Sequence, residues 1–161
     1  MSDPTVAEAW VAAPLRRLME EARLISGVLL YPTGRAVGQF GFSNAADVMS
    51  ICALTSAINA SSRELGRQLD GKPFYELHHA GAERQVFMAR ATAAGQEFLF
   101  VGVFDQESSL GVVEIYFAEF QKSLEKLRPQ QQPSTTPLPS GDFEGELNRS
   151  LDALFGPIGK R

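Results

Sequence analysis

Residues 98–113 of this chain read Phe-Leu-Phe-Val-Gly-Val-Phe-Asp-Gln-Glu-Ser-Ser-Leu-Gly-Val-Val. The stretch opens with a run of apolar residues, which is typical of a strand that is buried on both faces. A polar turn follows at 105–108, and from Leu110 onward apolar residues recur every three or four positions. The stretch therefore predicts a central strand over 97–104, a polar capping turn and a helix over 109–127.

The remaining elements are predicted from the same two periodicities. Helices are expected over 14–25 and 44–69, and strands over 27–31, 35–42, 74–79 and 84–93. The long helix carries one apolar row, which comprises Val48, Ile51, Thr55, Ile58, Ser62, Leu65 and Leu69. Gly71 and Pro73 are expected to end this helix. The predicted fold class is α+β, a sandwich with the order α-β-β-α-β-β-β-α and a five-stranded antiparallel sheet.

Local composition divides the chain into four parts. An N-terminal extension over 1–13 precedes a folded domain over 14–128, and a linker rich in Pro, Gln, Ser and Thr covers 129–140. The last part, 141–161, is the tail; its apolar anchors are Phe143, Leu147, Leu151, Leu154 and Phe155. Their spacing is typical of a short amphipathic helix that lies in a groove. We expect the tail to dock either on a partner protein or on the chain itself.

The charge and composition exclude several classes of function. The 161 residues carry a formal net charge of −4, so no excess of Lys and Arg is present to displace counterions from nucleic acid. The single cysteine, Cys52, cannot form an internal disulfide, which fits a reducing compartment. Residues 1–15 lack the basic start and apolar run of a targeting signal, and the apolar stretch 27–31 is too short to span a bilayer. We expect a soluble, cytoplasmic protein that binds no nucleic acid and inserts into no membrane.

The motifs that carry chemistry in other proteins are incomplete here. Residues 66–72 match the start of a phosphate-binding loop, but Pro73 stands where Ser or Thr would bind magnesium. The segment also closes a predicted helix, so a helix C-cap explains both of its glycines. His78 and His79 are neighbours on a predicted strand and point to opposite faces, which disfavours a shared metal. Cys52 is expected to be a packed side chain. We expect no catalytic constellation, no metal site and no cofactor.

Two stretches carry a family resemblance. In residues 74–82 a phenylalanine is followed by His79-Ala80-Gly81, and in residues 101–113 Phe104-Asp105 and a short polar turn lead to Ser109-Leu110-Gly111. With these motifs the chain resembles the roadblock/dynein light-chain family, and within it the MglB-like bacterial polarity proteins. The resemblance covers about residues 15–155, and its last part, Leu151 to Phe155, is similar to the C-terminal extension of the MglB-like proteins.

The resemblance implies a homodimer whose sheets join edge to edge and whose long helices pack together. It also implies that a Ras-like small GTPase of the MglA type sits on the helix face of the dimer. MglB-like proteins act as GTPase-activating proteins in cell polarity or motility, and they reposition the catalytic groups of the GTPase instead of inserting an arginine finger. The tail would bind the GTPase away from its nucleotide. The alternative is a roadblock scaffold or adaptor that binds a GTPase without accelerating hydrolysis.

The long helix supplies the predicted contact face. The small residues Ala53, Ala57 and Ala60 would let another backbone approach closely, and the resemblance places a partner there. In the following turn Arg63 and Glu64 stand where the family has small residues, and Arg67 follows. These charged residues are predicted either to add contacts with the partner or to form a solvated helix end.

Overall fold

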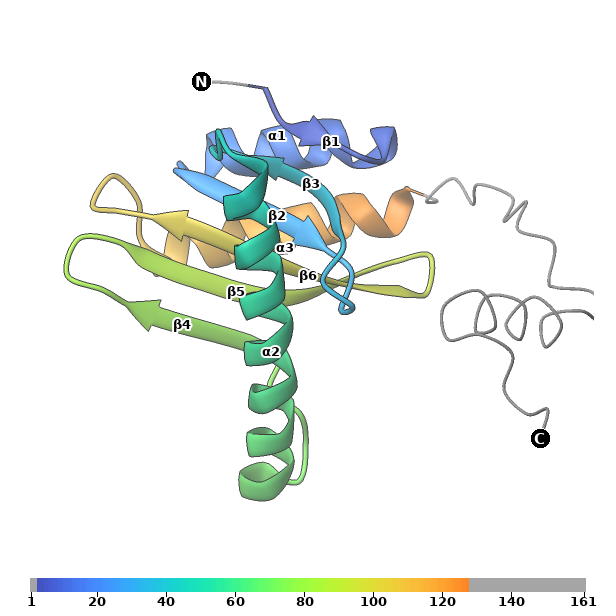
Figure 1. Cartoon of the computed structure of the whole chain (residues 1–161), viewed down its shortest axis with the longest axis vertical. Coiled ribbons are helices and arrows are strands. Elements are labelled where there is room, and N and C mark those ends of the chain that lie inside the picture. Colours follow the sequence, from blue (N-terminus) through green and yellow to red (C-terminus); the bar gives the residue numbers. More distant parts are fainter. Residues whose placement is uncertain (1–2, 128–161) are drawn as a thin grey trace, which may run out of the picture. The chain divides into compact units, whose positions relative to one another are not determined.

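The computed structural model describes residues 3–127, which form one antiparallel sheet with helices on both faces (Figure 1). The sheet order is β1-β3-β2-β6-β5-β4. The strands are β1 (Thr5–Val6), β2 (Ser26–Leu30), β3 (Ala36–Phe40), β4 (Glu76–Ala80), β5 (Gln85–Ala93) and β6 (Gln96–Phe104). The helices are a short 3-10 turn, η1 (Ala9–Val11), and α1 (Ala12–Glu21), α2 (Ala45–Asp70) and α3 (Leu110–Lys126). Figure 1 shows α1 and α3 on one face of the sheet and α2 crossing the other face.

The predicted α+β class and the predicted order of the main elements are confirmed, but the sheet has six strands where five were expected. The additional strand, β1, consists of Thr5 and Val6 and pairs with β3 at the edge of the sheet. Two residues cannot display the alternation that identifies a strand, so the sequence carries no signal for it. The central position of β6 is confirmed, since it lies between β2 and β5.

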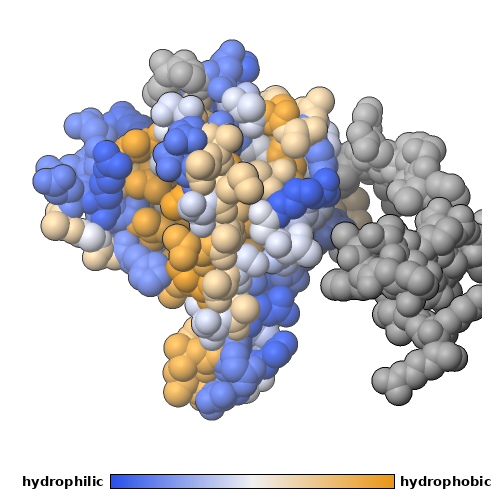
Figure 2. Space-filling model, viewed as in Figure 1, coloured by the Kyte–Doolittle hydropathy of each residue, from blue (hydrophilic) through white to orange (hydrophobic). Residues whose placement is uncertain are grey.

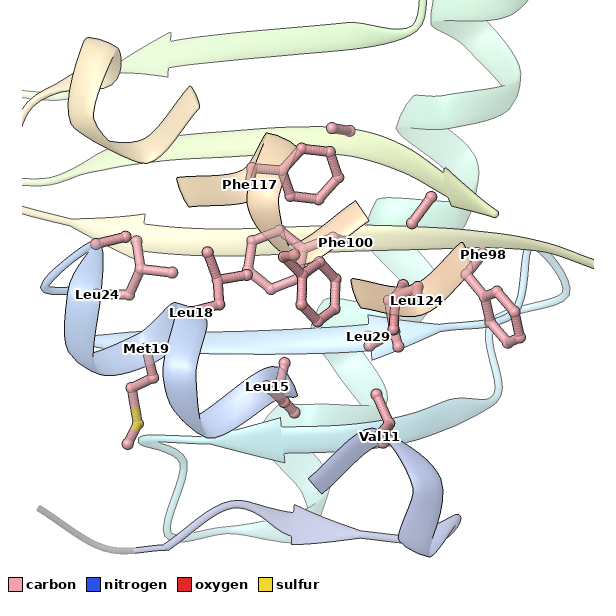
Figure 3. Packing of buried hydrophobic residues seen from close by; sticks show 14 of the residues in the cluster. Val11, Leu15, Leu18, Met19, Leu24, Leu29, Phe98, Phe100, Phe117 and Leu124 are labelled. Atoms are coloured by element: carbon pink, nitrogen blue, oxygen red, sulfur yellow. The ribbon is translucent and has the colours of Figure 1, made fainter. Parts of the chain in front are cut away.

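The main core fills the space between the sheet and the pair of helices α1 and α3 (Figure 3). Phe117 and Phe120 of α3 pack on Phe100 of β6, with ring centroids 5.6 and 5.9 Å apart. Phe117 also meets Phe87 of β5 at a centroid distance of 5.3 Å. Each side chain of this size contributes roughly 1.5–3 kcal/mol when it is fully buried, so this layer dominates the stability of the domain.

A thinner core lies under α2. It contains Val28, Leu30, Cys52, Met88, Leu99 and Val101. Cys52 is 2% exposed, which confirms the prediction of a packed side chain, and burial raises the pKa of its thiol. The fully buried residues of α2 are Cys52, Thr55 and Gly66, so most of this 26-residue helix faces away from the domain.

Both ends of α2 follow the sequence prediction to within one residue. The Ala46 amide donates to Asn44 Oδ1 at 2.8 Å, which caps the first turn. Gly71 closes the last turn in the left-handed region, at φ 70°, and its amide donates to the Arg67 carbonyl. Gly66 lies against the returning chain, because a Cβ there would be 2.6 Å from Lys72 O and Phe74 N. The glycines of residues 66–72 therefore serve the helix end, as the sequence prediction held.

Helix α1 ends earlier than predicted. It stops at Glu21, whereas the apolar pattern favoured a helix to residue 25. Arg23 enters the left-handed region at φ 53°, and the Leu24 amide donates to the Met19 carbonyl at 3.0 Å. This turn places Leu24 in the core, where it is buried. A left-handed arginine has no sequence signature, since glycine is the residue that usually takes this conformation.

The polar turn after β6 is confirmed. Asp105 Oδ1 accepts from the Glu107 amide at 2.9 Å, and Ser109 Oγ accepts from the Val112 amide at 3.4 Å at the start of α3. Ser108 makes a contact of another kind, since its hydroxyl donates to the Ala22 carbonyl at 2.6 Å. That bond joins the turn to the end of α1, so the turn fixes both helices of the main core.

Candidate functional site

The outward side of α2 is lined with small residues. Ala53, Ala57 and Ala60 are all exposed, and their spacing of four and three positions puts them on one side of the helix. The same side carries Ala46, which belongs to the predicted stripe of small residues, and two small exposed residues that the sequence prediction did not include, Ser50 and Ser61. Figure 2 shows this side of α2 as a pale, weakly hydrophobic band down the middle of the view. A row of small side chains would let a partner backbone come close to the helix.

Large apolar residues flank this band and lie open to solvent. Leu54 is 59% exposed, Leu65 52% and Leu69 67%. The predicted apolar row thus divides, since Val48, Ile51 and Ile58 pack on the core whereas Leu65 and Leu69 do not. Figure 1 shows the reason: the last turns of α2 extend beyond β4, where no strand lies beneath them. Leu65 and Leu69, one turn apart, therefore make a candidate contact surface for another protein.

Strand β4 forms an open edge next to the free end of α2. It pairs with β5 on one side, and within residues 3–127 no strand pairs with its other side. Most of its residues are exposed, and Leu77 is half-buried under the α2 layer. An edge strand presents unpaired backbone groups, which are a template for pairing with another chain. The sheet edge and the exposed leucines are therefore two candidate contact surfaces of the domain.

Arg63 stands apart from the other predicted contact residues. Its Nη1 lies 3.1 Å from Glu97 Oε1, and Arg90 Nη2 lies 2.6 Å from the other oxygen of Glu97. The guanidinium of Arg90 in turn lies 5.0 Å from the centre of the Tyr75 ring. Glu97 therefore ties α2 to the sheet. No sequence pattern indicates this bond, because 34 positions separate Arg63 from Glu97.

Glu64 and Arg67 complete the set of predicted residues. Both are exposed, and Arg67 Nη1 lies 3.7 Å from Glu64 Oε2 in an i,i+3 pair. Exposed pairs of this kind contribute little to stability, about 0.2–0.5 kcal/mol. Glu64 also accepts from Gln68 Nε2 at 3.0 Å, so it holds two neighbours on the helix surface.

The described part of the chain offers little room for small-molecule chemistry. A cavity between α2 and the strands, beside Asn59, Tyr75 and Arg90, has a volume of ≈ 20 Å³, which is enough for about one water molecule. His78 Nε2 lies 2.8 Å from Gln85 Oε1. Among residues 3–127 no three His, Cys, Asp or Glu side chains gather as metal ligands would.

None of the helices within the described residues has the length and apolar character that a membrane crossing requires. The predicted tail, with Phe143, Leu147, Leu151, Leu154 and Phe155, lies outside the described residues, as does the predicted linker. Their role stays a prediction.

Several solved structures share this architecture. MglB of Myxococcus xanthus is 24% identical with a TM-score of 0.63, over 72% of this chain and 92% of that protein. The gliding protein MglB of Thermus thermophilus is 20% identical with a TM-score of 0.61, over 71% of this chain and 85% of that one. A roadblock/LC7 domain of Streptomyces avermitilis is 23% identical with a TM-score of 0.53, over 62% of this chain and 81% of that domain. Protein-family descriptions and curated proteins gave no match. The family resemblance of the sequence is thereby confirmed at the level of the fold: this chain has the roadblock fold of the MglB proteins.

Proposed function

We propose that this chain is a homodimeric, cytoplasmic regulator of a Ras-like small GTPase of the MglA type, and that it acts as a GTPase-activating protein in cell polarity or motility. The observation that carries the proposal is the exposed row Ala53, Ala57 and Ala60 on α2, beside an open sheet edge. Such a face suits a broad contact with a folded protein, because only methyl groups separate the helix from its partner. The fold shared with MglB proteins supports the same function.

Two protomers would join through β4 and the overhanging end of α2. Pairing between the two β4 edges would continue the sheet through both protomers, and the second protomer would cover Leu65 and Leu69. Burial of these exposed leucines favours association at roughly 25 cal/mol per Å² of apolar surface. A contact of this kind uses the same patch on both protomers. The assembly therefore stops at a dimer.

The dimer is tested by Leu65→Asp, which would bury a carboxylate in the proposed contact. We expect a protein of half the wild-type mass in light scattering, with an unchanged circular dichroism spectrum. Gln68→Asp is the matched control, since Gln68 is exposed one turn away and faces solvent beside Glu64. A Leu65→Asp protein that keeps the wild-type mass would show that this end of α2 is not the dimer contact.

The GTPase contact is tested by Ala57→Arg, because a long charged side chain would hold a partner away from the helix. We expect binding of a GTP-loaded MglA-type GTPase to fall by at least tenfold, which corresponds to about 1.4 kcal/mol. Ala118→Arg on α3 is the control, as Ala118 is equally an exposed helical alanine. Equal binding of the GTPase by both variants would show that the GTPase does not contact this side of α2.

The activating mechanism is tested by single-turnover GTP hydrolysis. We expect the wild-type protein to accelerate hydrolysis, and Arg67→Ala to retain most of that effect. An inserted arginine finger is worth about 10³–10⁵ in rate, so a loss of that size would overturn the finger-free mechanism. Release of a fluorescent nucleotide, measured in parallel, separates accelerated hydrolysis from accelerated exchange.

The second candidate function is a scaffold or adaptor that binds the GTPase without changing its turnover. The charged residues Arg63 and Glu64 favour it, since the resemblance places small residues of the family at these two positions. The same assay decides: binding that Ala57→Arg abolishes, together with an unchanged rate of hydrolysis and exchange, would establish the scaffold.

A further inference from the structure

The first described residues cover an edge of the sheet that would otherwise be open. We call residues 3–11 the N-terminal strap. In its strand β1, Thr5 pairs with Gln39 and Val6 with Gly38 of β3. The Ala7 amide extends the pairing by donating to the Val37 carbonyl at 2.8 Å. Without the strap, β3 would be a second edge strand opposite β4.

The absence of a side chain at Gly38 leaves space on β3 for the strap. Gly38 lies in the middle of β3, and a Cβ at that position would be 3.1 Å from Val6 Cγ1 and 3.3 Å from Val11 Cγ1. Leu15 Cδ2 would be as close, at 3.0 Å. Val11 is fully buried, and Figure 3 shows Val11 and Leu15 pointing into the core. The missing side chain of Gly38 therefore makes the room in which the strap lies.

A polar latch holds the strap in place. Glu8 Oε1 accepts from the Tyr31 hydroxyl at 2.6 Å, and Glu8 Oε2 accepts from Trp10 Nε1 at 2.6 Å. Arg35 Nη2 lies 3.9 Å from the same carboxylate, and its guanidinium stacks 4.3 Å from the centre of the Tyr31 ring. Both oxygens of Glu8 thus accept a hydrogen bond. One donor is Trp10 of the strap, and the other is Tyr31, which directly follows β2.

The outer side of the strap is a poor template for a further strand. Backbone N–H groups alternate in direction along a strand, as side chains do. The Ala7 amide points toward β3, so the Val6 amide points outward. The next outward position would be residue 4, which is Pro4 and has no N–H. Strand β1 thus occupies the pairing edge of β3 and presents one outward donor, the Val6 amide.

We propose that the N-terminal strap is an edge guard, which seals β3 and leaves β4 as the one open edge of the described sheet. A sheet with two open edges can add copies on both sides and grow into an open chain of molecules. A sheet with a single open edge stops after one symmetric pairing. The strap thereby sets the size of the assembly.

The edge guard is tested by Val6→Asp, which puts a carboxylate against the gap at Gly38 and lifts β1 from β3. The matched control is Thr5→Asp, which adds the same charge one residue earlier on an exposed side chain. Light scattering over a range of concentrations gives the mass of each protein. We expect Val6→Asp to reach about twice the wild-type mass or more, since a second copy pairs with the bared β3. Thr5→Asp keeps the wild-type mass.

A second variant, which lacks residues 2–7, removes β1 but retains Glu8 and its latch. It is expected to show the same increase in mass, with a folded circular dichroism spectrum. Folded strap variants that keep the wild-type mass would overturn the edge guard. Failure of both variants to fold would also overturn it, because the strap would then be a part of the core that cannot be lifted.

The inference rests on the proposed function only in taking β4 as the dimer edge. A wild-type protein that is monomeric would contradict the proposed dimer and leave the expected increase in the strap variants unchanged. An unchanged mass in those variants would contradict the edge guard and leave the dimer intact.

Discussion

The carboxylate of Glu8 accepts one hydrogen bond on each oxygen, from the Tyr31 hydroxyl and from the Trp10 ring nitrogen. Partial burial and the neighbouring carboxylate raise the pKa of Tyr31, so its hydroxyl stays protonated and remains a donor at any physiological pH. Removal of one donor leaves a partly buried charge with fewer partners, which costs more than the loss of a neutral hydrogen bond.

We therefore predict that Tyr31→Phe lowers the free energy of unfolding by about 1.5–3 kcal/mol, the range for hydrogen bonds to charged groups. Urea denaturation measures this change. Tyr75→Phe is the control, because Tyr75 is an exposed tyrosine and its ring still supports Arg90 after the change. Equal stability of the two variants would mean that the bond to Glu8 contributes nothing.

Glu76 on β4 gives a prediction that depends on pH. Loss of hydration is the main cause that raises the pKa of Glu76, and repulsion from the Glu114 carboxylate of α3 adds to it. A carboxyl group whose pKa is higher in the folded state than in the unfolded state favours folding when it is protonated. That contribution is lost as the pH rises through the folded-state pKa.

Glu76→Gln is therefore expected to stabilise the protein at neutral pH, and the gain should shrink as the pH falls through the pKa of Glu76. Thermal unfolding between about pH 3.5 and 7.5 tests this, since that range brackets the ordinary pKa of a glutamate. Glu114→Gln should give a smaller gain of the same sign, since it removes only the second cause. A gain from Glu76→Gln that is constant over the whole range would exclude titration of Glu76 as its source.

At the scale of elements, local signals decided what the sequence could predict. Asn44 and Gly71 act within one helical turn of themselves, so α2 was predicted to within a residue at both ends. The end of α1 depends on Arg23, which takes a left-handed conformation just before the buried Leu24. Strand β1 depends on the gap at Gly38, a feature that exists only after folding. Both features depend on tertiary contacts, which produce no periodic pattern in the sequence.

Gly66 near the end of α2 is predicted to resist substitution by alanine. Gly66→Ala would favour the helix by up to about 1 kcal/mol in propensity alone, but the new Cβ would lie 2.6 Å from backbone atoms of Lys72 and Phe74. Backbone cannot move aside as a flexible side chain does. We expect a net destabilisation of about 1–3 kcal/mol in urea denaturation, as for other overpacked sites.

Gly111→Ala is the matched control in α3, because no atom outside its chain neighbours and the backbone of its own helix lies within 4 Å of a Cβ there. It is expected to be neutral or stabilising by up to about 1 kcal/mol. Destabilisation of both variants to the same degree would show that the contact with the returning chain is not the cause.

At the scale of the whole molecule, the candidate site was predicted in part. The sequence identified the small residues of α2, and the structure places Ala53, Ala57 and Ala60 on its exposed side. It did not separate Arg63 from them, because the partner of Arg63 belongs to a distant strand. Nor did it distinguish Leu65 and Leu69 from the packed part of the same row. An apolar row on a helix predicts that the row is covered, but it does not tell whether the sheet of the same domain or another protein covers it.

The tail gives the last prediction. The buried residues of the main core lie between Val11 and Leu124, and the tail is predicted to lie outside this core. Deletion of residues 141–161 is therefore expected to leave the domain folded in circular dichroism and dimeric in light scattering. The predicted role of the tail is a second contact with the GTPase, held near the first contact by the linker. Loss of a tethered contact removes its effective concentration, so we expect GTPase binding to weaken by at least about tenfold in calorimetry.

A full-length Leu151→Asp variant separates the apolar anchors from the length of the chain. It keeps the linker and the acidic residues of the tail but places a charge within the anchor row. If the anchors act as predicted, this variant should bind the GTPase as weakly as the truncated protein. A truncated protein that is insoluble or monomeric would instead mean that the tail packs on its own domain. In that case Leu151→Asp should lower the stability of the domain before any GTPase is added.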